Sequence, residues 1–151
     1  MDFIGRQCDF IPCVLYDQIT KLMPIASVEA VIVIDNSLLF LKRKNTPAMG
    51  QWWFAGDRIR KGESFEEALR REVKEETGLE VSAYRLISAY SRVFPERHDI
   101  TIAFLCRCKG KITLDSEHFE YALFKSLPEG LHPYLLETIS DSQWEKREAV
   151  T

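Results

Sequence analysis

The stretch DRIRKGESFEEALRREVKEETGL, residues 57–79, decides the fold because it predicts a capped helix with clustered carboxylates. Ser64 is a favourable N-cap, and Glu67, three residues later, completes a capping box. Gly78 lies where a glycine C-cap belongs. An apolar stripe along the same stretch predicts one face packed on a core, and it consists of Phe65, Ala68, Leu69 and Val73.

Three glutamates of this helix, Glu72, Glu75 and Glu76, occupy positions i, i+3 and i+4. This spacing directs their side chains into one narrow sector, where like charges repel. A solvated acidic face is one interpretation. The alternative is a bound cation, because clustered carboxylates are the oxygen ligands that Mg²⁺ prefers.

The same stretch resembles the Nudix signature, Gly-x5-Glu-x7-Arg-Glu-U-x-Glu-Glu-x-Gly-U, where U is a bulky aliphatic residue. Every specified position matches except the first, where Asp57 replaces glycine. If the turn needs a positive φ there, Asp57 is strained, and its charge lies near the metal. The resemblance implies an α+β fold, an αβα sandwich with a mixed β-sheet between helices. Its loop and helix, 57–79, would hold Mg²⁺, or Mn²⁺ in its place, against a diphosphate.

The Nudix resemblance also implies the roles of individual residues. The carbonyl of Gly56 and the carboxylates of Glu72 and Glu76 are expected as metal ligands, with Glu75 nearby. Arg71 is expected to orient the glutamates or to meet phosphate. Arg71 and Glu75 are thus predicted as catalytic residues, and Gly56, Glu72 and Glu76 as metal ligands.

The remaining sequence predicts further elements in an order that suits an α+β domain. Residues 11–23 have helical apolar spacing that ends at Pro24, and residues 25–34 form a β-branched strand. Further strands are expected at 38–41, 81–94, 100–108 and 119–124, with a closing helix near 135–144. No repeat or linker divides the chain, so residues 1–151 are predicted to form a single domain.

A second resemblance extends beyond the signature. The stretch LKRKNTPAMGQWWF, residues 41–54, with Gly56–Ile59, looks like the GDP-mannose mannosyl hydrolases, a branch of the Nudix family. Leu15–Tyr16, Met23–Ile25 and Asp115–His118 look similar as well. This resemblance implies a nucleotide-sugar substrate such as GDP-mannose. It also implies attack of water on the anomeric carbon, which releases nucleoside diphosphate and sugar.

The mannosyl hydrolase resemblance implies a base and a further ligand. His118 would be the general base, and the ordinary pKa of histidine suits that role. Glu117 stands where that group has a glutamine ligand to the metal, beside the contributions of Gly56 and Glu76.

The same resemblance implies residues that bind the substrate. Arg58 and Arg71 would stabilise charge on the departing diphosphate, because guanidinium groups match phosphate oxygens. Arg43 would also approach the diphosphate. Glu29 stands where the group has an aspartate that contacts the ligand, so sugar or base specificity can differ.

Two alternatives remain open. The mannosyl hydrolases lack two of the three helix glutamates, whereas this chain retains Glu72, Glu75 and Glu76. The complete set favours a pyrophosphatase that attacks phosphorus with several metals and Glu117 or Glu120 as base. A non-catalytic Nudix-fold binding module is the third hypothesis.

Composition narrows the function classes. The 151 residues carry a net charge of −3, which argues against nucleic acid as the main partner. Four cysteines do not suggest a disulfide framework. The first five residues lack a secretory signal, and no apolar stretch approaches the roughly 20 residues of a membrane helix. A cytoplasmic protein is expected, and the resemblance implies a homodimer with the first helix as the candidate interface.

Overall fold

The computed structural model describes residues 11–116 and 118–146. Glu117 and the first five residues, which the predictions above include, lie outside this part. The helices and strands follow in the order α1 (Cys13–Leu22), β1 (Ile25–Ile34), β2 (Ser37–Arg43), β3 (Trp52–Trp53), α2 (Phe65–Thr77), β4 (Glu80–Val93), β5 (His98–Lys109), β6 (His118–Phe124) and α3 (Pro133–Ser142).

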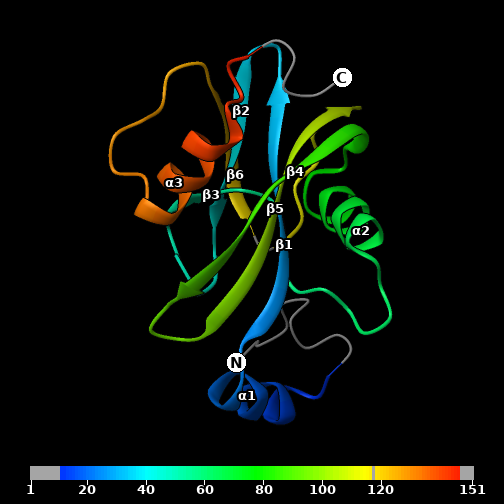
Figure 1. Cartoon of the computed structure of the whole chain (residues 1–151), viewed down its shortest axis with the longest axis vertical. Helices are drawn as coiled ribbons and strands as arrows, with labels where there is room; N and C mark the ends of the chain where they lie inside the picture. The colour runs from blue at the N-terminus through cyan, green and yellow to red at the C-terminus, as the bar shows by residue number, and fades with distance from the viewer. Residues whose placement is uncertain (1–10, 117, 147–151) are drawn as a thin grey trace.

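A mixed sheet forms the middle layer of the molecule, with α2 on one side and α3 on the other (Figure 1). The strand order is β3-β2-β1-β5-β4, and β6 also pairs with β2. β1 and β5 run parallel, whereas the other neighbours are antiparallel. This arrangement confirms the predicted α+β sandwich.

Strand β1 is covered on both faces, and its sequence reflects this position. Val28 and Ile32 pack in the cluster that includes Leu69 of α2. Val31 packs in the opposite cluster with Leu135 of α3. A strand buried on both faces needs apolar residues at nearly every position, which is why this segment is rich in β-branched residues.

Helix α2 has the predicted ends. Ser64 accepts a hydrogen bond from the Glu67 amide, and the Glu67 side chain accepts one from the Ser64 amide. Gly78 adopts the left-handed conformation at φ 74°. The capping box and glycine cap therefore fix the start and end of the helix that carries the three glutamates.

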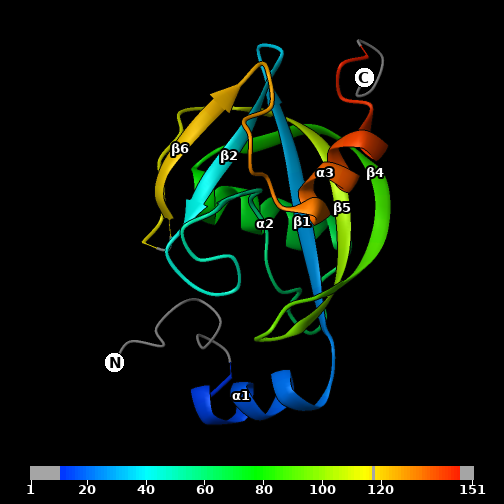
Figure 2. The same ribbon diagram turned by 90° about the vertical axis from the view of Figure 1, so that its left-hand side faces the viewer.

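Helix α1 lies beyond the end of β1, apart from the two helices that cover the sheet (Figure 2). It is shorter than the predicted 11–23, because Met23 is extended and the residue before a proline is disfavoured in a helix. Tyr16 is the buried residue of α1, whereas Val14 and Leu22 are exposed. Within the described residues, no helix has the length and apolar character needed to cross a membrane.

Candidate functional site

The loop that leads into α2 is attached to β1 by its backbone. Gly56 has a φ of 136°, and a Cβ atom at this position would lie 2.1 Å from the carbonyl oxygen of Val28. Glycine is therefore required where the loop approaches the strand. The flanking hydrogen bonds run from Ala30 N to Ala55 O (2.8 Å), Val28 N to Asp57 O (3.0 Å) and Ile59 N to Ala26 O (2.8 Å).

Glu76 connects this loop to α2. The amide of Gly56 donates a hydrogen bond to Oε2 of Glu76 at 3.0 Å. The Glu76 side chain is completely buried. Two residues that were predicted as metal ligands are thus brought together from the loop and from the helix.

Arg71 holds the other carboxylates in place. Its guanidinium donates to both oxygens of Glu63 at 2.6 and 2.7 Å, to Glu72 at 2.6 Å and to Glu75 at 3.4 Å. It also donates to the carbonyl oxygen of Arg58 at 3.1 Å. The hydrogen bond from Arg71 lowers the pKa of Glu63. Of its two predicted roles, Arg71 has the geometry of the first, orientation of the glutamates.

His118 lies beside the same helix, at the start of β6. Its Nδ1 is 2.7 Å from Oδ1 of Asp115, and its Nε2 is 3.9 Å from Oε2 of Glu76. The His118 side chain is 1% exposed, and among the described residues Nε2 has no hydrogen-bond partner. Asp115 therefore orients the imidazole so that Nε2 is directed toward Glu76.

The donor set near α2 suits a hard divalent cation. Within the described residues, no group of three or more histidine, cysteine, aspartate or glutamate side chains forms a ready metal site. Glu72 and Glu76 are nevertheless buried carboxylates, and the Gly56 backbone adjoins Glu76. Buried carboxylates need a compensating charge, and carboxylate and carbonyl oxygens are the ligands that Mg²⁺ takes.

A small cavity of about 30 Å³, lined in part by charged side chains, adjoins Gly56 between the loop and the sheet. Glu29 and Arg43, two of the predicted substrate-binding residues, both line it. Arg43 is also paired in register with His118 between β2 and β6, so the cavity and the histidine are neighbours. The lining consists of Ser27, Val28, Glu29, Arg43, Pro47, Trp53, Gly56, Asp57, Arg92, Phe94, Arg97, Asp99 and Thr101.

Glu29 is fixed by two partners from distant parts of the chain. Its Oε2 accepts from Nη1 of Arg92 at 2.7 Å and from Nε1 of Trp53 at 3.1 Å. Among the described residues, Oε1 of Glu29, Oγ of Ser27 and Nε of Arg92 have no hydrogen-bond partner. Buried polar atoms are normally satisfied, so these atoms suit a polar ligand in the cavity.

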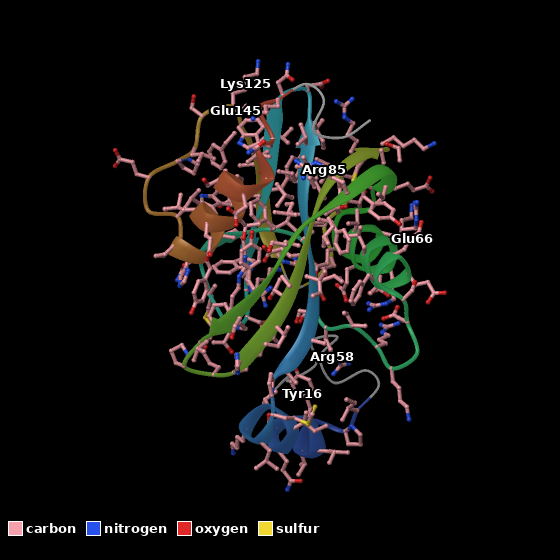
Figure 3. All side chains as sticks on the ribbon, in the orientation of Figure 1. Tyr16, Arg58, Glu66, Arg85, Lys125 and Glu145 are labelled. Atoms are coloured by element: carbon pink, nitrogen blue, oxygen red, sulfur yellow. The ribbon has the colours of Figure 1, made fainter. Side chains whose placement is uncertain are left out.

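The third predicted substrate residue, Arg58, lies elsewhere. Its guanidinium stacks over the ring of Tyr16 at 5.1 Å from the ring centroid, and Figure 3 labels both residues near α1. Arg58 does not line the cavity. The structure therefore brings Glu29 and Arg43 together but separates Arg58 from them.

Sequence reasoning missed three charged residues of the cavity: Arg92, Arg97 and Asp99. Arg97 pairs with Asp57 at 2.9 Å and with Asp99 at 2.8 Å. Burial raises the pKa of Asp57, but Arg97 and Arg43 outweigh it and lower the pKa to about 2. Strand alternation was the available signal, because Asp99 occupies a buried position in β5.

Comparisons with known proteins show the family of this chain. The NUDIX domain family model matches residues 23–137. An ADP-ribose pyrophosphatase from Methanocaldococcus jannaschii is 37% identical over 71% of the chain, and the match spans 66% of that protein's own length. The low-salt glycan biosynthesis protein Agl8 from Haloferax volcanii is 28% identical over 80% of the chain and 83% of its own.

A solved structure resembles the fold as well. A MutT NUDIX hydrolase from Burkholderia pseudomallei superposes with a TM-score of 0.73 at 24% identity. The match covers 79% of this chain and 98% of that protein.

Proposed function

The chain belongs to the Nudix hydrolase family, and we propose that it hydrolyses a nucleoside diphosphate whose terminal phosphate carries a sugar. Two relatives support this substrate class: one is named for ADP-ribose, itself such a molecule, and the other for glycan biosynthesis. The acidic helix face, and the buried polar atoms beside it that have no hydrogen-bond partner among the described residues, also support it, because a diphosphate needs a cation and a sugar supplies hydroxyl groups.

The cation is Mg²⁺, or Mn²⁺ in its place, and Gly56, Glu72, Glu76 and Glu117 would hold it. When bound, it neutralises the negative charge of the diphosphate. Arg43 lines the cavity and supplies a second positive charge for the phosphates.

The main observation in favour of attack at carbon is the pairing of His118 with Asp115. An oriented imidazole with Nε2 facing the acidic site can take a proton from water as a general base. Water then attacks the anomeric carbon with inversion, and nucleoside diphosphate leaves. GDP-mannose is the substrate that this mechanism and the resemblance of residues 41–54 favour.

Cleavage at phosphorus is the second candidate. The chain keeps Glu72, Glu75 and Glu76, and the relative at 37% identity is named a pyrophosphatase. Several bound cations and a carboxylate base would then give a nucleoside monophosphate and a sugar phosphate.

Hydrolysis in ¹⁸O-labelled water decides between these candidates. The protein is incubated with MgCl₂ and either GDP-mannose or ADP-ribose, and the products are resolved by mass spectrometry. Nucleoside diphosphate with labelled sugar supports attack at carbon, whereas nucleoside monophosphate with sugar phosphate supports attack at phosphorus. Turnover of neither compound would contradict the proposed substrate class and favour the binding module.

We also propose a homodimer that covers the exposed apolar residues of α1. Val14, Leu22 and the adjacent Met23 are exposed hydrophobic side chains on or next to this helix. Light scattering should give twice the chain mass of 17.5 kDa. A mass near 17.5 kDa would contradict the dimer, and Leu22→Glu should shift a true dimer to that value.

A further inference from the structure

Asp57 replaces the first glycine of the Nudix signature, but the backbone at this position does not need a glycine. Asp57 has no positive φ; the preceding Gly56 adopts that conformation instead. An aspartate is therefore accommodated at this position without the penalty expected from the sequence. Its buried carboxylate has partners that a glycine could not have.

The carboxylate has two direct partners, and one of them, Arg97, extends the contacts to α1 and β5. Oδ1 of Asp57 accepts from the amide of Arg58 at 2.8 Å and from Nη2 of Arg97 at 2.9 Å. Arg97 also donates to the hydroxyl of Tyr16 in α1 at 3.0 Å and pairs with Asp99 in β5. All of these side chains except Arg58 are buried. Hydrogen-bonded charges with so little exposure hold a fixed geometry.

Tyr16 provides a second connection between this cluster and Arg58, in addition to the hydrogen bond from the Arg58 amide to Asp57. The Arg58 guanidinium lies over the Tyr16 ring, and Figure 3 labels these two residues. The Tyr16 hydroxyl accepts a hydrogen bond from Arg97. Since Tyr16 is the buried residue of α1, the helix is held to the domain at the point where it contacts the loop. The backbone and the side chain of Arg58 thus depend on one cluster.

We propose that Asp57 is a positioning residue that, through Arg97 and Tyr16, fixes the loop carrying Gly56 and Arg58 relative to Glu76. This inference rests on the proposed function only for its effect on turnover. The position of the loop can be measured without metal or substrate. In this chain the signature glycine is replaced by a carboxylate that stabilises the loop.

The first test is hydrogen exchange of the metal-free protein. The amides of Gly56 and Ile59 report loop position, because their acceptors are Glu76 and Ala26 rather than Asp57. Asp57→Gly and Asp57→Asn should speed exchange of these two amides by about tenfold, while core amides of β5 stay protected. The control, Asp141→Asn, removes a carboxylate that accepts from Tyr90 far from the loop, and should leave both amides unchanged.

Asp57→Gly also tests whether Asp57 raises or lowers kcat, because this variant restores the glycine of the Nudix signature. If Asp57 positions the loop, this variant should lower kcat on the order of tenfold to 100-fold with little change in KM, and Asp57→Asn should retain more activity. Equal or higher activity together with unchanged exchange would overturn the proposal. If the wild-type protein cleaves no diphosphate, the proposed function fails, yet the exchange measurement still decides the role of Asp57.

Tyr16→Phe is a milder variant in case Asp57→Gly does not fold. It removes only the hydroxyl that accepts from Arg97 and keeps the ring under Arg58. A smaller increase in exchange at Gly56 and Ile59 is expected. Unchanged exchange in both Tyr16→Phe and Asp57→Asn would overturn the proposal.

Discussion

The acidic face of α2 and the neighbouring cavity both contain charged side chains, but they differ in the ratio of carboxylates to arginines. On the helix side, the described ion pairs join Glu63, Glu72 and Glu75 to Arg71, and Glu75 also to Arg60, while Glu76 lies 3.9 Å from His118. The cavity instead places three carboxylates among three arginines, namely Glu29, Asp57, Asp99, Arg43, Arg92 and Arg97. An excess of carboxylate attracts a cation, whereas a balanced lining suits the polar, uncharged part of a ligand.

We propose that the two regions bind different parts of the substrate. The diphosphate and its cation bind at the acidic face, with Arg43 reaching the phosphates from the cavity side, and polar groups of the sugar or base bond to the cavity lining. The predictions below test this division, starting with the largest expected effect.

Removing one arginine from each region should destabilise the protein in both cases, but Mg²⁺ should offset only the loss on the helix side. Arg92→Met leaves Glu29 buried without its charged partner, and should lower the free energy of unfolding by about 3–5 kcal/mol. Arg71→Met also destabilises, but Mg²⁺ should restore part of the loss, because it neutralises the same carboxylates. Urea unfolding with and without Mg²⁺ measures both effects, and equal responses to Mg²⁺ would contradict the division.

Glu76→Gln should have the next largest effect, on catalysis. The substitution keeps the shape of a completely buried side chain but removes its charge. We expect kcat to fall by roughly 100- to 1,000-fold and Mn²⁺ affinity to weaken, since a metal contributes several kcal/mol. Glu66→Gln, on the exposed side of the same helix, is the matched control. Unchanged Mn²⁺ binding in Glu76→Gln would place the cation elsewhere.

His118→Asn tests whether water attacks the anomeric carbon or phosphorus. If His118 is the general base, kcat should fall by about 100-fold or more while Mn²⁺ affinity is retained. Release of nucleoside monophosphate at the wild-type rate would instead assign the chemistry to the glutamates. His98→Asn removes a histidine that contacts Ser91 on the β4–β5 hairpin, and should have no effect on kcat.

The smallest expected effect concerns acid stability on the helix side. The Arg71 hydrogen bond lowers the pKa of Glu63 in the folded state, so its stabilisation is complete above the ordinary value of about 4.3. It is lost as the pH falls through the lowered pKa. Glu63→Gln should make unfolding free energy less dependent on pH below about 4.3, by roughly 1 kcal/mol or less. An identical pH profile would show that Glu63 does not titrate differently on folding.

Local patterns were sufficient for most of the fold. The capping box at Ser64, the glycine cap at Gly78 and the β-branched run at 25–34 all lie within the elements they predict. Predicted boundaries shifted where backbone pairing decided them: β5 begins at His98 rather than at 100, because antiparallel pairing with β4 continues to that residue. The run of apolar residues in the sequence does not reveal this extension, because the two added residues, His98 and Asp99, are polar.

Only part of the candidate site was predictable, because some of its residues are far apart in the sequence and meet only in the fold. Glu63, Arg71, Glu72 and Glu76 lie within one loop and helix, so spacing along the chain brings them together. Glu29 was singled out through resemblance, but nothing in the sequence pointed to Arg92 as its partner.

The sequence by itself determined the acidic helix and its capped ends, because a helix converts fixed spacing into a shared face without help from the rest of the chain. Only the tertiary structure decided that Asp57 pairs with Arg97, which also donates to the hydroxyl of Tyr16. It also decided that the cavity combines opposite charges from strands far apart in sequence. Such pairings depend on which strands become neighbours, and the parallel pairing of β1 with β5 sets that order.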